Sequence, residues 1–318
     1  MKFRLFTLLL LPAAIFFAYG CGDDAKTVVV DFSNAVASEQ AAEHSSESPS
    51  LKVAVGAMIS PKETFSYYGQ LLDYIGGQLG LEVQLIQRKT YAEINDLFGK
   101  GGIDLAFVCS GPYANGKEKY GFDLLSTPQI HGSHFYQSYL IVNRNSLFHS
   151  LKDLRGMAFA FTDPESNTGK LVPTYWLAKM GERPETFFSK TIYTHSHDNS
   201  IFAVAQGLVE GAAVDSLIWE YYHSKSPSFT SSTRIIKKSE PYGNPPLVTS
   251  RHLPPGLRER IREILFSMHS DPEGRNILKE LMIDRFITPQ EAWYAGIRKM
   301  VQELAVMGGE HAFSKPQK

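Results

Sequence analysis

The body of the chain alternates short apolar runs of extended pattern with longer runs of helical pattern, and this alternation limits the possible folds more than any other feature. The series begins at Leu51, where LKVAVGAMI has the composition of a buried strand and the next run, 66–80, places apolar residues at helical spacing. LEVQLIQR, a helix opened by a capping box of Thr90 and Glu93, and IDLAFVCS continue it. This βαβαβ order predicts an α/β fold in which helices cover a parallel sheet.

A second series of the same kind follows the extended run HFYQSYLIVNR at 134–144. It comprises MAFAFT, a helix from Gly169 to Met180, KTIYTH, a helix through FAVAQGLVEG, and AAVDSL. TRIIKKSEP and PPLVTSRHL then have extended patterns, and helical amphipathic runs complete the chain from Pro255. We therefore predict two lobes joined by two crossovers, with a ligand in the cleft between them at the strand C-terminal ends. The predicted lobes are residues 51–142 plus 240–318 and residues 143–239.

The N-terminal segment has the pattern of an export signal. Lys2 and Arg4 precede an apolar run at 5–17, which is shorter than the ~20 residues that a spanning helix needs. Residues 1–20 are therefore predicted to be a secretory signal peptide. Gly20-Cys21 resembles the end of the lipobox of bacterial lipoproteins, which predicts acylation of Cys21; the alternative is an ordinary cleavage site with an incidental cysteine.

Composition then limits the partners of the exported chain. The acidic, Ser- and Ala-rich remainder of residues 21–50 predicts a disordered tether, and the protein is expected in the cell envelope, held by lipid and facing the periplasm or the extracellular side. Removal of residues 1–20 leaves 30 basic and 33 acidic residues, a net charge of −3, so no nucleic-acid partner is expected. Cys109 is the only other cysteine and is predicted to be a buried small hydrophobe.

Small polar residues are concentrated where the strand at 157–162 gives way to a helix. In FTDPESNTGKLVPTYWL, Ser166, Asn167 and Thr168 stand at this joint. A helix cap would need only one of them, whereas several hydroxyls and free amides at a helix N-terminus suit an oxyanion. A nucleotide-binding P-loop is excluded, because Pro164 stands where its first glycine belongs and Leu171 where its Ser or Thr belongs.

The run YTHSHDNSIFAVAQGLVEGAAVDSL, residues 193–217, offers two histidines. A metal site would use His195, His197 and Asp215, but His-x-His alone is weak evidence for zinc. Alternatively, His197 and Asp198 occupy a second strand-to-helix joint and supply a donor to the same oxyanion. A third possibility is that Asp198 caps the helix and both histidines are solvated.

A third joint lies in FVCSGPYANGKEKYG, residues 107–121. Ser110 and Tyr113 there supply a hydroxyl and an aromatic ring at the end of a strand. Tyr67 and Tyr68, near the start of the first helix, could add a phenol or an apolar wall, and one of them is expected to be ordinary packing.

These residues carry a resemblance to the substrate-binding proteins of ABC importers for phosphonate, phosphite and phosphate. DPESNTGKLVP resembles that family's D-P-x-S-x-[ST]-G…P turn, THSHDNS its G-S-H-D turn, and IDLAFVCSGPYANG its D-x-A-[FW]…Y segment. GLVEGAAVDSLIWE is similar to its G-x-[VI]-[DE]-A-x-x-[VI]-[DN]-[ST] stretch and SDPEGRNILKEL to a late D-P-x-G-x-x-x-L helix. The resemblance implies a two-lobed, type II periplasmic-binding-protein-like clamshell. It also implies that Ser166, Thr168 and His197 surround phosphoryl oxygens and that Tyr68 and Tyr113 close the pocket, while His195 and Lys170 depart from the family pattern.

We therefore expect a substrate-binding lipoprotein that captures phosphonate, phosphite or phosphate and delivers it to an ABC permease and its ATPase. The expected binding residues are Tyr68, Ser110, Tyr113, Ser166, Asn167, Thr168, His197, Asp198 and Asp215. No catalytic residue, metal or cofactor is expected, and phosphonate or phosphite ranks above phosphate. One alternative is a ligand-sensing module for a membrane signalling partner. The other, an enzyme on the same fold, is disfavoured because the chain has no Gly-x-Ser-x-Gly elbow and no HExxH motif.

Overall fold

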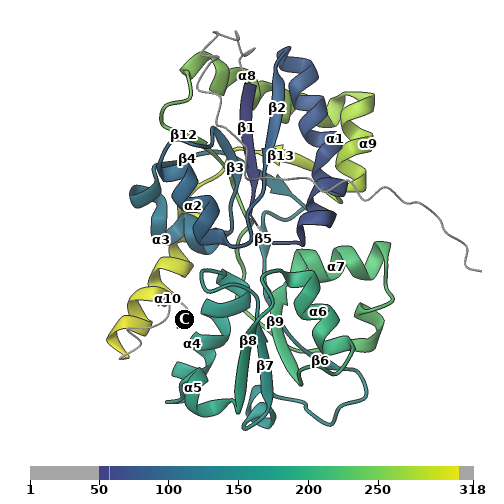
Figure 1. Cartoon of the computed structure of the whole chain (residues 1–318), viewed down its shortest axis with the longest axis vertical. Helices are drawn as coiled ribbons and strands as arrows, with labels where there is room; N and C mark the ends of the chain where they lie inside the picture. Colours follow the sequence, from purple (N-terminus) through teal and green to yellow (C-terminus); the bar gives the residue numbers. More distant parts are fainter. Residues whose placement is uncertain (1–49, 57, 308–318) are drawn as a thin grey trace, which may run out of the picture. The chain divides into compact units, whose positions relative to one another are not determined.

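The computed structural model of the protein describes residues 50–56 and 58–307 (Figure 1). Its first lobe is built on a mixed sheet with the strand order β13-β4-β12-β3-β1-β2. Its strands are β1 (Ser50–Val55), β2 (Glu82–Ile86), β3 (Leu105–Phe107), β4 (Phe122–Gln129), β12 (Leu247–Ser250) and β13 (Arg285–Ile287). Its helices are α1 (Pro61–Leu79), α2 (Tyr91–Gly99), α3 (Ser110–Tyr120), α8 (Pro255–Ser267) and α9 (Pro272–Glu280). β1 is parallel to β2 and β3, whereas β12 is antiparallel to β3 and β4.

The alternation of side chains along β1 divides the core of this lobe between two faces of the sheet. Val53 and Val55 belong to one buried cluster with Leu71 of α1, while Ala54 belongs to another with Ile94 of α2. This is the two-residue period of a strand buried on both faces, which explains why β1 is continuously apolar over Val53–Val55, whereas Ser50 and Lys52 at its start are exposed.

The second lobe is built on a five-stranded mixed sheet within the described residues, in the order β10-β6-β9-β7-β8. Its strands are β6 (Ser138–Asn143), β7 (Ala158–Phe161), β8 (Lys190–Tyr193), β9 (Gly211–Asp215) and β10 (Thr233–Lys238). Its helices are α4 (Val172–Ala178), α5 (Pro184–Phe187), α6 (His197–Ala205) and α7 (Ser216–Lys225). β7 is parallel to β8 and β9, and β6, which follows the first crossover, is antiparallel to β9 and β10.

The two crossovers between the lobes pair with each other. β5 (Phe135–Tyr136) is antiparallel to β11 (Tyr242–Gly243). The single strand expected over 134–144 is divided at Gln137. The amide of Gln137 does not pair with a strand and donates instead to Ser216 Oγ at 3.0 Å. β6 then pairs with β9 of the second lobe, so the first crossing is complete before Ser138. The sequence pattern had predicted a later crossing, after residue 142.

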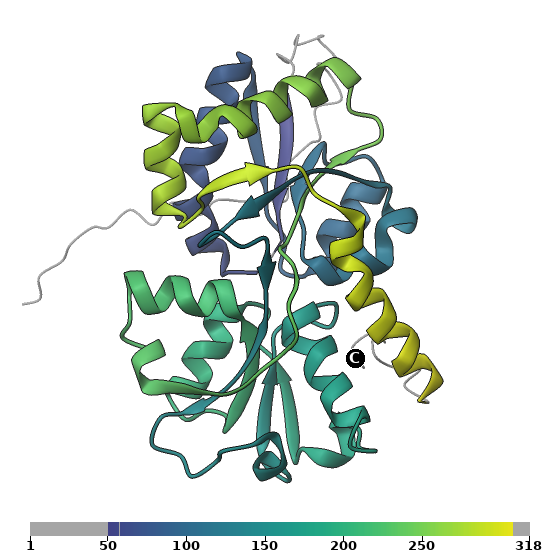
Figure 2. The ribbon, with the colours of Figure 1, turned by 180° about the vertical axis from the view of Figure 1, so that it is seen from behind.

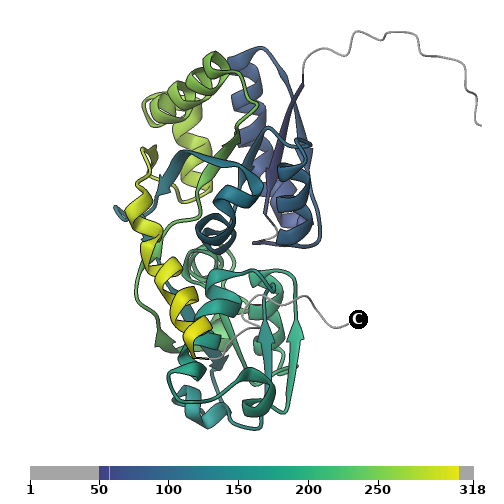
Figure 3. The same cartoon turned by 90° about the vertical axis from the view of Figure 1, so that its left-hand side faces the viewer.

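The C-terminal part adds a strand that the helical pattern after Pro255 did not predict. β13 pairs with the outer edge of β4, as Figure 2 shows from behind. Figure 3 shows the course of the last described helix, α10 (Ala295–Val306), along the side of the molecule. Its Ile297 and Met300 are buried in the same cluster as Val172 of α4. This helix therefore packs against elements of both lobes.

The described residues all belong to one compact unit, residues 47–318. The predicted signal peptide, Cys21 and nearly all of the tether lie outside the described residues. Within 50–56 and 58–307, no helix combines the length and the apolar character that crossing a bilayer requires.

Candidate functional site

Two of the predicted joints lie against the same side chain, Thr162, at the end of β7. A Cβ atom on Gly169 would lie 2.4 Å from Thr162 Oγ1, so only glycine allows the turn that precedes α4 to approach so closely. On its other side, Thr162 Oγ1 lies 3.1 Å from Nδ1 of His197, the first residue of α6. The turn at 166–169 and His197 are thus held on two sides of one threonine.

The turn itself is a short π-helix, Asn167–Leu171, that leads into α4. Ser166 Oγ accepts a hydrogen bond from the amide of Gly169 at 3.0 Å, so this hydroxyl serves as the helix cap. Asn167 Nδ2 donates to the Tyr136 hydroxyl at 3.1 Å, which leaves its Oδ1 buried without a hydrogen-bond partner in the described part of the chain. Thr168 Oγ1 is also buried without a hydrogen-bond partner among the described residues. The backbone carbonyl of Thr168 accepts a hydrogen bond from Ser138 Oγ at 2.7 Å.

His197 is a fully buried imidazole whose proton can be placed from its contacts. The amide of Asp215 donates to Nδ1 at 3.1 Å, so Nδ1 is an acceptor and the neutral ring carries its proton on Nε2. Burial lowers the pKa of His197 to about 3, which keeps the ring neutral near pH 7. Nε2 has no partner among the described residues and is therefore an N–H donor available to a ligand.

Tyr91, which was not among the predicted site residues, supplies a further buried hydroxyl. Its Oη has no hydrogen-bond partner in residues 50–56 and 58–307. Burial raises the pKa of this phenol well above its ordinary value, with Cys109, Asp163 and Asp215 adding to the effect, so it is an O–H donor. The signal was present in the sequence, since Tyr91 begins the helix after β2, a joint of the same kind as the other three.

Three of the predicted residues are engaged elsewhere. The Tyr113 hydroxyl donates to Glu291 and its ring packs edge-on against Tyr294 at 4.7 Å, so this hydroxyl already has a protein partner, and the closing of the pocket by Tyr113 stays a prediction. Ser110 Oγ donates to the carbonyl of Gly243 at 2.8 Å. Asp198 Oδ1 accepts the amide of Ser60 at 3.0 Å, which makes it a contact between the lobes.

The structure also shows how the two histidines lie. β8 ends at Tyr193 and His195 has a φ of 63°, so His195 and His197 do not share one face of a strand. Ser196, rather than Asp198, caps α6. Residues 50–56 and 58–307 contain no group of three or more His, Cys, Asp and Glu side chains arranged to hold a metal ion.

Four buried residues with unpartnered polar side-chain atoms come from both lobes: Tyr91 from α2 of the first, and Asn167, Thr168 and His197 from the second. The amide of His197 donates to the carbonyl of Met58 at 2.9 Å, and the amide of Tyr91 donates to Asp163 Oδ2 at 3.1 Å. At the start of α3, a Cβ on Gly111 would lie 2.8 Å from the carbonyl of Glu165, so the two backbones are in close contact there. We call the four side chains Tyr91, Asn167, Thr168 and His197 the polar seat.

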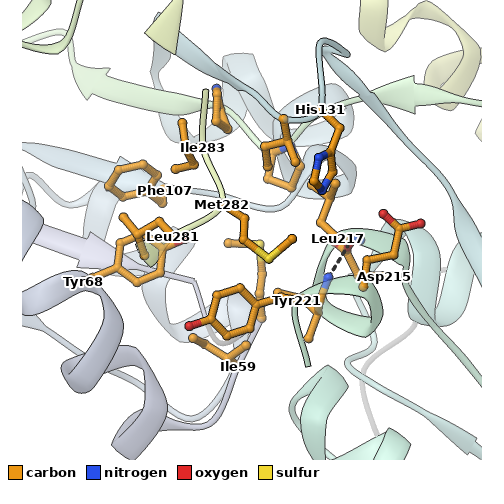
Figure 4. A pocket seen from close by; sticks show the side chains of 16 residues that line it. Ile59, Tyr68, Phe107, His131, Asp215, Leu217, Tyr221, Leu281, Met282 and Ile283 are labelled. Atoms are coloured by element: carbon orange, nitrogen blue, oxygen red, sulfur yellow. Dashed lines mark hydrogen bonds between the residues drawn. The ribbon is translucent and has the colours of Figure 1, made fainter. Parts of the chain in front are cut away.

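Asp215 and Tyr68 both line a cavity of about 100 Å³ (Figure 4), and the amide of Asp215 also donates to His197 Nδ1. Asp215 Oδ1 accepts the amide of Leu217 at 2.7 Å and caps α7. Burial raises the pKa of Asp215 to about 7, and burial together with Asp215 raises the pKa of Tyr68 to about 12. Near neutral pH, the carboxyl group is therefore only partly ionised.

The fold and this enclosed polar seat define a two-lobed α/β binding protein of the type II periplasmic class. The chain belongs to the family described as "ABC transporter, phosphonate, periplasmic substrate-binding protein", whose model matches residues 53–294. The family is one of substrate-binding proteins and not of enzymes. This confirms the family and the fold predicted from the sequence.

Individual relatives are distant. The chain is 24% identical over 209 residues to the phosphonates-binding periplasmic protein of Escherichia coli, a match that covers 64% of this chain and 62% of that protein. A binding protein component of an ABC phosphonate transporter from Pseudomonas aeruginosa has a similar structure, with a TM-score of 0.78, 22% identity, and coverage of 82% of this chain and 88% of that one. A Prochlorococcus marinus protein in complex with methylphosphonate gives a TM-score of 0.73, 20% identity, and coverage of 80% and 98%.

Proposed function

We propose that this chain is the substrate-binding lipoprotein of an ABC importer and that it captures a small phosphorus oxyanion for delivery to the permease and its ATPase. The observation that carries the proposal is the polar seat. Thr168, Tyr91 and His197 each hold a buried donor without a partner among the described residues. Buried polar groups are nearly always hydrogen-bonded in folded proteins, so three exceptions on residues that adjoin Thr162 and Asp163 at the end of β7 favour a ligand there.

The kind of donor supports a phosphorus oxyanion. The seat offers two hydroxyls and one neutral imidazole N–H, all of which donate to oxygen without carrying a full positive charge. Asn167 adds an amide that can turn over so that Tyr136 donates to its oxygen, which would leave its NH₂ facing the seat. Phosphonate ranks first as the ligand, because one structural relative is described with methylphosphonate and the matched family is named for phosphonate.

The Thr168 hydroxyl provides the test of this site. Thr168→Val removes a donor that has no partner within the described residues, so the stability of the ligand-free protein should be unchanged or slightly raised. Affinity for methylphosphonate, measured by calorimetric titration, should fall about tenfold to a hundredfold, the effect of one charge-assisted hydrogen bond. Thr168→Ser, which keeps the hydroxyl, should restore binding.

Thr174→Val is the matched control, because its hydroxyl donates to the carbonyl of Lys170 at 2.8 Å and is not part of the seat. This variant should bind methylphosphonate as the unmodified protein does. Equal affinities of Thr168→Val and the unmodified protein would remove Thr168 from the site.

The lipid anchor is the second part of the proposal. Cys21 follows Gly20 at the end of the signal-like run and precedes the polar segment that ends near residue 50. Cells grown with a fatty-acid probe should label the protein, and Cys21→Ser should abolish the label. Labelling that survives the substitution would contradict the anchor and would leave the proposed ligand untouched.

A further inference from the structure

The C-terminal helix α10 connects the two lobes through side chains that are not part of the polar seat. The turn before it, η6 (Glu291–Tyr294), is held by the first lobe, where Glu291 accepts a hydrogen bond from Tyr113 of α3. Halfway along α10, Met300 Sδ accepts a hydrogen bond from the hydroxyl of Tyr242, in the crossover strand β11, at 3.9 Å. Figure 3 shows α10 passing from the level of one lobe to that of the other. The start of the helix is therefore anchored to the first lobe.

Glu303, in the last turn of α10, contacts the second lobe. Its carboxylate accepts hydrogen bonds from the hydroxyl of Tyr175 at 2.5 Å and from the ammonium group of Lys179 at 2.8 Å. Tyr175 belongs to α4 and Lys179 is the C-cap of that helix. The hydrogen bonds from Lys179 and Tyr175 lower the pKa of Glu303, so the group is ionised near neutral pH and both bonds are charge-assisted. Lys299, 3.8 Å from the same carboxylate, lies within α10 itself.

The helix that Glu303 holds is continuous with the turn that carries part of the polar seat. α4 follows directly from the short π-helix Asn167–Leu171, which contains Thr168. Leu171, at this junction, is fully buried in the same cluster as Ile297 of α10. The position of α10 against α4 therefore affects the turn whose Thr168 hydroxyl is proposed to bind the ligand.

The contact at Glu303 is sensitive to the angle between the lobes. Closure of a two-lobed protein around a ligand rotates one lobe relative to the other about a hinge. Glu303 lies about 12 Å along the helix from Ala295, at the end far from the anchored turn. A hydrogen bond is lost once donor and acceptor are about 3.6 Å apart, so a small opening rotation breaks the hydrogen bonds of Glu303.

We propose that Glu303 is a positioning residue for the ligand-bound form, and that its contact with α4 forms on closure and slows release of the ligand. An interaction made only in the closed form adds to affinity, whereas one kept in both forms adds to stability alone. Glu303 acts through α4 and does not touch the ligand. The inference rests on the proposed function, because it requires a ligand that closes the lobes.

Stopped-flow tryptophan fluorescence with methylphosphonate measures association and release separately. Trp176 provides the signal, because it lies on α4 and packs against the cluster that contains the buried face of α10. Glu303→Ala should raise the release rate about threefold to tenfold and leave association within about twofold. Tyr175→Phe should raise the release rate less, and adding it to Glu303→Ala should have no further effect, since both remove the same contact.

Lys117→Gln is the matched control. Lys117 of α3 pairs with Glu291, at the other end of the same C-terminal segment. Both members of this pair belong to the first lobe, so the pair is kept whether the lobes are open or closed. Lys117→Gln should therefore release methylphosphonate at the unmodified rate, although urea unfolding should show a small loss of stability similar to that of Glu303→Ala.

The outcomes separate this inference from the proposed function. If Glu303→Ala releases methylphosphonate at the unmodified rate, or if Lys117→Gln accelerates release equally, the contact at Glu303 has no special role in the closed form. Either result overturns the inference and leaves the proposed function standing. If neither methylphosphonate nor phosphite binds the unmodified protein, the proposed function fails and the inference fails with it.

Discussion

Gly169→Ala should destabilise the protein by roughly 1–3 kcal/mol, the usual effect of overpacking a buried site, and should also abolish ligand binding. The new methyl group would lie 2.4 Å from Oγ1 and 2.5 Å from Cβ of Thr162, so the turn or Thr162 must move. Thr162 contacts His197 Nδ1 at 3.1 Å and Ser200 Oγ at 3.3 Å. A movement there would displace the imidazole as well as the turn that carries Thr168.

Gly77→Ala gives the matched control for this substitution. Gly77 lies within α1 in an ordinary helical conformation, and nothing lies within 4 Å of a Cβ placed on it. The same change should therefore stabilise the protein by about 0.5–1 kcal/mol, since alanine is the better helix former. Urea unfolding of the two variants measures the difference. Equal stabilities would contradict the close contact at Gly169.

Asp215→Asn should stabilise the ligand-free protein near pH 8 by roughly 4 kcal/mol and have little effect near pH 4. Burial raises the pKa of Asp215 to about 7, so the native state holds a proton that the unfolded state has already lost above its ordinary pKa. The free energy of unfolding therefore falls as pH rises from about 4 to 7 and remains lowered above that range. Asparagine removes this effect and keeps an oxygen that can accept the amide of Leu217.

Urea unfolding near pH 4 and near pH 8 measures this gain. His197 has the opposite pH dependence, since its lowered pKa makes stability rise with pH between about 3 and 6.5, but both proteins contain His197 and its contribution cancels. Asp271→Asn is the control, because Asp271 caps α9 through the amide of Gly274 at 2.7 Å from a partly exposed position. A gain near pH 8 no larger for Asp215→Asn than for Asp271→Asn would contradict the buried charge.

The fold was predictable because its signals are local. The capping box of Thr90 and Glu93 forms as expected, and the two βα series give the two sheets. β13 was not predictable, since three residues beside long amphipathic helices carry no distinct pattern and pair only because the edge of β4 is available. The first crossing was misplaced because Ser138–Asn143 has a buried apolar centre like the strands of the first lobe, and only its pairing with β9 assigns it to the second.

The candidate site was predictable in kind and less so in detail. Ends of parallel strands meet at one edge of a sheet, which brings Thr168 and His197 together from separate joints. The sequence could not indicate which hydroxyls the fold itself uses, and Ser166 is engaged as a cap while Thr168 is not. Which tyrosine lies beside the seat depends on tertiary packing. The Tyr113 hydroxyl donates to Glu291. The Tyr136 hydroxyl accepts a hydrogen bond from Asn167, and Tyr136 lies in the paired crossovers β5 and β11.

A crystal structure of the protein with methylphosphonate tests the central claim most directly. The account predicts phosphonate oxygens within about 3.2 Å of Thr168 Oγ1, Tyr91 Oη and His197 Nε2. A phosphonate bound away from these three atoms, or a structure in which they remain unpaired beside a ligand held elsewhere, would contradict the account.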